Sequence, residues 1–256
     1  MIDPRAIVHL NAELAPDVKV GPYSIIGPDV QIDAGTEIGP HVVINGPTTI
    51  GKDNSIYQFA SIGEDPQDKK YADELTRLEI GDRNVIREFC TMHRGTQQDQ
   101  GVTLIGDDNL FMAYTHVAHD CVVGNHVIMA NGASIAGHVH VDDHVILGGF
   151  TLVHQFTQIG EFSFSAMGSA ITQDVPPYVM VGGRPTRPHG INSVGMERNG
   201  KSPEVIRQIR KAYKILYKNN LRLEDAIEEM EDMAGESNEL SNMVCFLRNV
   251  TRGILR

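Results

Sequence analysis

A twelve-residue stretch, THVAHDCVVGNH at positions 115–126, carries side chains that could act on a substrate. It holds three histidines, His116, His119 and His126, together with Asp120. Neutral imidazoles are good zinc ligands, and a histidine beside a carboxylate can also serve as a general base. At this point a third interpretation is equally open, in which the histidines are only polar residues at turns.

The elements that must position these residues repeat every six residues. Apolar residues occupy every sixth position from Ile2 to Ile62 and from Ile80 to Met92. The same period resumes, shifted by one residue, from Ile105 to Ile159 and at Ile171. This period fits neither an α-helix nor a plain strand, and it is typical of hexapeptide-repeat solenoids. We predict a mainly β protein, a left-handed parallel β-helix over residues 1–190, with eighteen residues in each three-sided coil.

Two polar segments interrupt the repeat, near residues 63–79 and 93–104, and are predicted to be loops. Solenoids tolerate insertions, but loops of this length are also often functional, so both interpretations stand. The segment VGGRPTRPHG at 181–190 predicts a turn-rich connector. Residues 191–256 predict a helical domain, with Ser202 as an N-cap, Pro203 at the first helical position, and two further helices near 224–234 and 239–250.

An eighteen-residue coil aligns several candidate side chains along one edge. The resulting column contains His119, Asp120, His138, His154 and Gln155. Neighbouring coils are about 5 Å apart, so these groups come within reach of one another. Two chemistries fit the column: a zinc site, or a histidine base oriented by Asp120 that activates a substrate hydroxyl for attack on an acyl group. His126 and His144 stack on a different edge, where polar turn residues are the simpler interpretation.

Composition excludes several classes of function. The chain of 256 residues has a net charge of −11, which disfavours non-specific binding to nucleic acid. Its three cysteines have no paired spacing, as expected of free thiols in a reducing compartment. There is neither a signal-peptide pattern nor an apolar run long enough to span a membrane, so a cytoplasmic protein is predicted.

An ordered set of motifs covers nearly the whole chain and resembles one family, the UDP-N-acetylglucosamine O-acyltransferases that begin lipid A biosynthesis. The motifs include GPYSIIGP, TRLEIGDRNVIRE, HRGT, HVAHDC, AGHVHVDD, QDVPPYV and TRGILR. The resemblance implies transfer of an (R)-3-hydroxyacyl group from acyl carrier protein to the 3-hydroxyl of UDP-N-acetylglucosamine. It implies no metal and no cofactor other than the phosphopantetheine of the carrier protein. Analogy at the level of the fold also implies a homotrimer.

The resemblance further implies roles for individual residues. His119 becomes the general base, Asp120 the acid beside it, and Gly137 the donor of a backbone N–H to the oxyanion. The substrate-binding residues would be Asp68, Lys70, His116, His138, His154, Gln155, Asn192 and Arg198. Met167 stands where some members have glycine, which implies a shorter acyl chain. A helix face with Arg207, Arg210, Lys211, Lys214 and Lys218 is expected to dock the acidic carrier protein, a solvated surface being the alternative.

Three other hypotheses share this fold. A zinc-dependent carbonic anhydrase would use histidines from neighbouring coils as ligands. The N-acyltransferase that acts later in the same pathway usually carries an additional domain before its repeats, whereas here the repeats begin at Ile2. A non-catalytic trimeric scaffold would explain the repeat but neither the two loops nor the histidine column.

Overall fold

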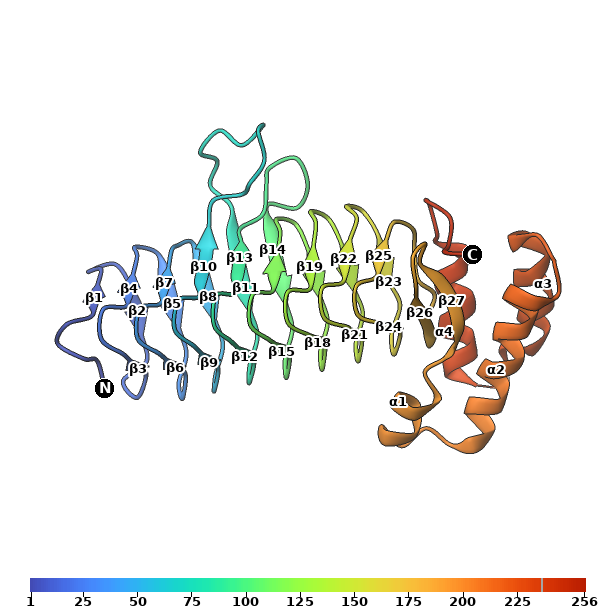
Figure 1. Ribbon diagram of the computed structural model, residues 1–256. Coiled ribbons are helices and arrows are strands. Elements are labelled where there is room, and N and C mark those ends of the chain that lie inside the picture. The colour runs from blue at the N-terminus through green and yellow to red at the C-terminus, as the bar shows by residue number, and fades with distance from the viewer. Residues whose placement is uncertain (236) are drawn as a thin grey trace.

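The computed structural model describes residues 1–235 and 237–256. It consists of a long three-sided coil followed by a group of helices at one end (Figure 1). The coil is built from three sheets of very short strands, and almost every strand pairs in parallel with the strand one coil away. The parallel β-helix with a C-terminal helical part is therefore confirmed.

The strands of the described residues divide among the three sides. Sheet I contains β1 (Ile7–Val8), β4 (Ile25–Ile26), β7 (Val43–Ile44), β10 (Ser61–Glu64), β13 (Thr91–His93), β16 (His116–Val117), β19 (Ser134–Ile135), β22 (Leu152–Val153) and β25 (Ala170–Ile171). Sheet II contains β2 (Glu13–Leu14), β5 (Val30–Ile32), β8 (Thr48–Ile50), β11 (Arg77–Ile80), β14 (Val102–Ile105), β17 (Val122–Val123), β20 (His140–Val141) and β23 (Gln158–Ile159). Sheet III contains β3 (Lys19–Val20), β6 (Glu37–Ile38), β9 (Ser55–Ile56), β12 (Val85–Ile86), β15 (Leu110–Phe111), β18 (Ile128–Met129), β21 (Ile146–Leu147), β24 (Phe164–Ser165), β26 (Val179–Gly182) and β27 (Arg187–Ile191).

The six-residue period is the period of the core. From Val20 onward, the apolar residues of the repeat are at most 4 % exposed, and Ile44, Ile50 and Ile62 are completely buried. Each such side chain contributes roughly 1.5–3 kcal/mol by leaving water. Ile2 is 48 % exposed, because it belongs to the first coil and no earlier coil covers it. The single polar exception, Ser165, is also buried, and its hydroxyl hydrogen-bonds to the Thr151 hydroxyl over 2.8 Å.

Strand register explains where the sequence period is interrupted. Regular coils pair residues eighteen apart, as in Ile7 with Ile25. Across the first interruption Ser61 pairs with Thr91, and across the second Thr91 pairs with His116. The first loop therefore adds twelve residues to a coil, which preserves the six-residue phase. The second adds seven, which shifts the phase by the one residue seen in the sequence.

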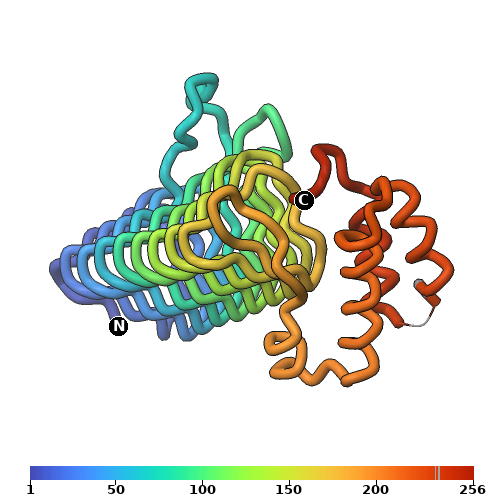
Figure 2. The backbone as a smooth tube through the Cα atoms, turned by 45° about the vertical axis from the view of Figure 1, so that its right-hand side comes forward, coloured from blue at the N-terminus to red at the C-terminus, as the bar shows by residue number. Residues whose placement is uncertain are grey.

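Both loops leave the coil at the edge between sheets I and II, which we call the loop edge. The first loop covers residues 65–76, between β10 and β11, and the second covers residues 94–101, between β13 and β14. Figure 1 shows them side by side above the coil, and Figure 2 shows the same arrangement from another direction. The coil thus acts as a rigid support that holds two loops over one edge.

The segment 181–190 is not simply a connector. β26 continues sheet III in parallel with β24, and β27 then turns back to pair antiparallel with β26. The prediction of a turn-rich connector is wrong at this point, because the prolines and glycines of the segment indicated irregular turns and gave no sign of paired strands. Its physical role is to cover the last open edge of sheet III.

Four helices follow the hairpin in the described residues: α1 (Ser193–Arg198), α2 (Pro203–Lys218), α3 (Leu223–Ala234) and α4 (Asn238–Arg248). The predicted start of α2 is confirmed, since the Ser202 hydroxyl accepts a hydrogen bond from the Val205 N–H and Pro203 opens the helix. The tail then returns to the coil, where Ile254 forms a bridge with Asp174. None of the described helices is long and apolar enough to cross a membrane.

Candidate active site

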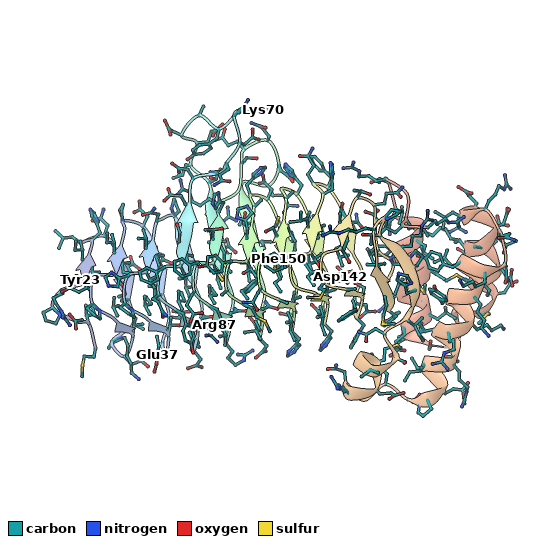
Figure 3. All side chains as sticks on the ribbon, viewed as in Figure 1. Tyr23, Glu37, Lys70, Arg87, Asp142 and Phe150 are labelled. Carbon is teal, nitrogen blue, oxygen red and sulfur yellow. The ribbon has the colours of Figure 1, made fainter. Side chains whose placement is uncertain are left out.

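A cleft of about 780 Å³ lies at the loop edge. Its walls come from the first loop (Gln67, Asp68, Lys69, Lys70), the second loop (Gln98, Asp99) and the coil itself (His119, His138, Gln155, Phe156). Figure 3 shows Lys70 on the first loop where it projects from the coil. The structure therefore brings together five residues that the sequence had singled out: Asp68, Lys70, His119, His138 and Gln155.

His119 and Asp120 form a hydrogen-bonded pair, with Nδ1 of the imidazole 2.8 Å from Oδ2 of the carboxylate. Neighbouring residues of a strand point to opposite faces, but these two lie in a turn, where Asp120 has a φ of +57°. Aspartate tolerates this left-handed conformation better than most residues do. The turn thus folds the carboxylate back onto its neighbour.

The carboxylate of Asp120 is only 1 % exposed and is held on both oxygens. Oδ1 accepts the backbone N–H of Thr96 at 2.8 Å, and Oδ2 accepts the Thr96 hydroxyl at 2.7 Å. Burial alone would raise the pKa of Asp120, but the hydrogen bonds from His119 and Thr96 outweigh burial and hold this pKa below its usual range. The role of Thr96 cannot be predicted from the sequence, since nothing in the repeat places the second loop over this turn.

Because an ionised carboxylate can only accept, Nδ1 of His119 must donate to Asp120. The other ring nitrogen, Nε2, is then a free acceptor, and no group in the part of the chain that the structure describes hydrogen-bonds to it. The imidazole side chain is 13 % exposed and borders the cleft. This is the arrangement that a general base requires.

Gly137 lies directly against the imidazole of His119. A Cβ atom at this position would come within 2.6 Å of Cε1 and 2.8 Å of Nε2. Only glycine therefore leaves room for the ring in its observed position. The backbone N–H of Gly137 has no hydrogen-bond acceptor among residues 1–235 and 237–256, so it is available to a bound group.

His138 forms the opposite side of the same site. Its ring stacks on Phe156, with centroids 4.3 Å apart and planes 5° apart, and meets His119 edge-on with centroids 5.1 Å apart. Its Nδ1 lies 2.7 Å from Oδ2 of Asp99 in the second loop. Asp120 and His138 align in successive coils as the eighteen-residue spacing predicts, but the next coil presents Phe156, which was not predicted, with Gln155 beside it at the cleft.

Arg94 ties the base of the first loop to the coil. Its guanidinium donates to the carbonyl oxygens of Gly46 and Gly63, to the Asp65 carboxylate, and to the Tyr71 hydroxyl. The side chain is 9 % exposed. Since Asp65 and Tyr71 flank Asp68 and Lys70 in the sequence, these contacts anchor both ends of the segment that borders the cleft.

His116 lies close to the cleft but does not border it. Its Nδ1 is 2.7 Å from the Thr91 hydroxyl, and its ring meets His93 edge-on. Burial, with smaller contributions from His93 and His119, lowers the pKa of His116 to about 4. The imidazole is therefore neutral near pH 7, which suits a hydrogen-bonding role better than a charged one.

Three predicted substrate-binding residues, His154, Asn192 and Arg198, and the residue predicted to limit the acyl chain, Met167, do not border the cleft in one chain. His154 is exposed beside Gln155, and Met167 is 78 % exposed in the turn between sheets III and I, across sheet I from His119. Asn192 is buried as the N-cap of α1, where its amide donates to the Phe162 carbonyl and accepts the Gly195 N–H. Arg198 is exposed at the end of α1, and α1 lies on the opposite side of the molecule from the two loops (Figures 1 and 2). Their contacts with substrate remain predictions.

The basic face of α2 is exposed as the helical period predicts. Ile206, Ile209 and Ile215 turn inward, whereas the five basic residues point to solvent. Arg207 pairs with Glu204, but no ion pair within the described ranges involves the other four, Arg210, Lys211, Lys214 and Lys218. Their positive charge is therefore available to a partner.

The column also has the composition of a metal site. One ligand atom each from His119, Asp120 and His138 lie within 4.8 Å of one another. However, Nδ1 of His119 and Oδ2 of Asp120 face each other at hydrogen-bond distance, and Nδ1 of His138 points to Asp99. These contacts suit proton transfer, and a metal could leave them in place only by binding the two Nε2 atoms, since a histidine ligand commonly donates its other ring N–H to a carboxylate.

A coil of six-residue repeats with a histidine–carboxylate pair in a cleft at its edge defines a hexapeptide-repeat acyltransferase. The family described as "Bacterial transferase hexapeptide (six repeats)" matches residues 11–46 and 103–137, and "Udp N-acetylglucosamine O-acyltransferase; Domain 2" matches residues 174–255. The chain belongs to the UDP-N-acetylglucosamine O-acyltransferase family and is an acyltransferase.

Relatives and solved structures carry this assignment. The chain is 58 % identical over 255 residues to the acyl-[acyl-carrier-protein]–UDP-N-acetylglucosamine O-acyltransferase of Alkalilimnicola ehrlichii, covering 100 % of this chain and 99 % of that one. Its structure matches the UDP-N-acetylglucosamine acyltransferase of Francisella novicida with a TM-score of 0.98 at 41 % identity, over 100 % of this chain and 94 % of the other. The corresponding enzyme of Moraxella catarrhalis gives 0.97 at 45 % identity, over 100 % and 99 %. These findings confirm the predicted family, and they favour neither the carbonic anhydrase nor the N-acyltransferase.

Proposed function

We propose that the protein transfers an (R)-3-hydroxyacyl group from acyl carrier protein to the 3-hydroxyl of UDP-N-acetylglucosamine, the first step of lipid A biosynthesis. The observation that carries this proposal is the His119–Asp120 pair, which leaves Nε2 of His119 as a free acceptor at the cleft. The names of the full-length relatives supply the two substrates.

His119 acts as the general base in this mechanism. Nε2 takes the proton of the sugar hydroxyl while the hydroxyl oxygen attacks the thioester carbonyl carbon. The new C–O bond forms, the C–S bond breaks, and the proton passes from His119 to the leaving phosphopantetheine sulfur. Asp120 stabilises the imidazolium that forms between these steps, and it holds the neutral ring in the correct tautomer.

The free backbone N–H of Gly137 supports the second part of this mechanism. It lies beside the His119 ring, where negative charge develops on the carbonyl oxygen during attack. Asp68 and Lys70 on the first loop, with His138 and Gln155 on the coil, border the same cleft and would hold the sugar nucleotide. No cofactor is required beyond the carrier's own phosphopantetheine.

An apolar surface suited to the acyl chain lies across sheet I from the base. Phe150, Leu152 and Met167 are 68 %, 57 % and 78 % exposed, and a cavity of about 470 Å³ borders the first two. Figure 3 marks Phe150 on this part of the coil. Met167, the neighbour of Gly168 in this cavity, would limit the length of the acyl chain, so a shorter hydroxyacyl group is expected than in relatives with glycine here.

Two partners complete the proposal. The unpaired basic residues of α2 would attract the acidic carrier protein, with an association that weakens as salt increases. Asn192, Arg198 and Met167 are far from His119 within one chain, so a neighbouring copy would have to bring them to the cleft. A cytoplasmic homotrimer, with clefts between its subunits, would do so.

The decisive experiment measures transfer from a series of 3-hydroxyacyl carrier proteins to UDP-N-acetylglucosamine. We expect ester formation by the purified protein, and a loss of at least a thousandfold in His119→Ala while the unfolding curve is retained. Metal analysis and chelator treatment of the same sample provide the comparison with a zinc enzyme. Stoichiometric zinc, or activity that survives His119→Ala, would contradict the mechanism.

A further inference from the structure

Asp99 forms a second histidine–carboxylate pair, opposite the first. Its Oδ2 lies 2.7 Å from Nδ1 of His138, although the two residues are separated by 39 positions in the sequence. Asp99 belongs to the second loop and borders the cleft. Its side chain is 37 % exposed, whereas that of His138 is 14 % exposed, so the loop brings a carboxylate from solvent to a largely buried ring.

Stacking fixes the plane of the His138 ring but not the position of its proton. Phe156 lies parallel to the ring, and His119 meets it edge-on. Neither contact distinguishes Nδ1–H from Nε2–H, because both involve the ring as a whole. The carboxylate of Asp99 does distinguish them, since it accepts a hydrogen only from Nδ1. It thereby leaves Nε2 as an acceptor, and no described group hydrogen-bonds to that nitrogen.

Asp99 also keeps the two histidines from competing for one carboxylate. Nδ1 of His138 lies 3.9 Å from Oδ2 of Asp120, the same oxygen that accepts from His119 and from the Thr96 hydroxyl. Without Asp99, the nearest described carboxylate for the His138 N–H would be this already occupied oxygen. Each histidine therefore has its own carboxylate.

The loop that carries Asp99 is fastened by the residue that also fastens Asp120. Thr96 donates its N–H and hydroxyl to Asp120, while its carbonyl accepts the N–H groups of Asp99 and Gly101 at 3.3 and 3.0 Å. A single residue thus contacts both the carboxylate of Asp120 and the backbone of Asp99. All three polar groups of Thr96, its backbone N–H, hydroxyl and carbonyl, take part in these contacts.

We propose that Asp99 is a positioning residue for the sugar acceptor. It holds the Nδ1–H of His138, so that Nε2 of His138 accepts a hydrogen bond from a hydroxyl of the sugar nucleotide bound beside His119. This inference rests on the proposed function, since it assumes that the ligand of the cleft is UDP-N-acetylglucosamine.

The test compares Asp99→Ala with Asp99→Asn and with Gln100→Ala, an exposed change in the same loop. Binding of UDP-N-acetylglucosamine is measured by calorimetry, and KM and kcat are measured in the transfer assay. We expect Asp99→Ala to raise the Kd and the KM for the sugar nucleotide about tenfold, with a smaller change in kcat, because one hydrogen bond in the cleft is lost. Asp99→Asn keeps an acceptor oxygen and should recover most of the affinity, and Gln100→Ala should match the wild type.

The outcomes separate this inference from the proposed function. If Asp99→Ala binds the sugar nucleotide as tightly as the wild type, or if Asp99→Asn recovers nothing, Asp99 does not position His138. If the wild type itself neither binds nor acylates the sugar nucleotide, the proposed function fails instead. Unfolding curves of all four proteins should coincide, since Asp99 is partly exposed and supports no core packing.

Discussion

The buried carboxylate of Asp120 offers the sharpest test of the mechanism. Asp120→Asn preserves the shape of the side chain but replaces one oxygen by an NH₂ group, which cannot accept a hydrogen bond. In the wild-type protein, Oδ2 of Asp120 accepts hydrogen bonds from both His119 and the Thr96 hydroxyl. With an amide nitrogen at that place, His119 would have to accept on Nδ1 and carry its proton on Nε2. The base would then point a hydrogen at the sugar hydroxyl that it must deprotonate.

The expected loss follows from this change of tautomer. General-base catalysis contributes about 10²–10⁴-fold, so kcat should fall by roughly a thousandfold or more, equivalent to about 4 kcal/mol of transition-state stabilisation. The KM for the sugar nucleotide should change little, because Asp120 is only 1 % exposed and does not border the cleft. Single-turnover and steady-state measurements of acyl transfer would separate these quantities.

A matched control is available at another edge of the coil. Asp107 also accepts a backbone N–H, that of Asp82, through its Oδ1, but it lies outside the cleft. Asp107→Asn keeps that acceptor and should retain full activity. Thr96→Val, which removes one of the hydrogen bonds to Asp120 but keeps the backbone N–H, should lie between the two. If Asp120→Asn retained kcat within tenfold of the wild type, the proposed orientation of His119 would be refuted.

The remaining predictions concern the acyl chain, the carrier protein and pH. Met167→Gly should shift the preferred donor towards longer 3-hydroxyacyl chains, by about tenfold or more in relative kcat/KM. The reason is that each added methylene contributes roughly 0.8 kcal/mol once it has space to be buried. An unchanged preference across a series of chain lengths would contradict the role of Met167. Lys211→Glu with Lys214→Glu should raise the KM for acyl carrier protein about tenfold at low salt, with less effect at high salt, whereas Arg207→Ala, which removes a residue already paired with Glu204, should matter less. The pKa of His116 is about 4 in the folded protein, below the usual 6.5. As the pH falls below about 6.5, His116 therefore binds a proton in the unfolded chain but not in the folded one, and the folded state loses stability. His116→Asn should therefore reduce the loss of unfolding free energy between pH 7 and pH 5 by about 2 kcal/mol, as measured by denaturant titration, and an identical loss in both proteins would argue against a buried neutral imidazole.

The sequence by itself determined the coil, because each of its inward positions has the same physical requirement. Every sixth residue must fill a dry interior between two neighbouring coils, so the apolar period can be read directly and is confirmed from Val20 to Ile171. The same eighteen-residue spacing correctly aligned Asp120 with His138 and separated His126 from them, since the register of stacked coils is fixed by the backbone. The start of α2 could also be predicted from the sequence, because the Ser202 N-cap and Pro203 stabilise the first turn of the helix through local contacts.

Only the tertiary structure decided how the site is assembled. The two loops contain no sequence repeat. Nothing in the sequence therefore shows that Thr96 hydrogen-bonds to both carboxylate oxygens of Asp120, or that Asp99 hydrogen-bonds to His138. Likewise the hairpin of β26 and β27 depends on an open sheet edge that exists only once the coil is built. Repetition makes the scaffold predictable, because each coil meets the same neighbours as the last. The chemistry lies where that repetition is interrupted, and there contacts between distant segments determine which group each side chain meets.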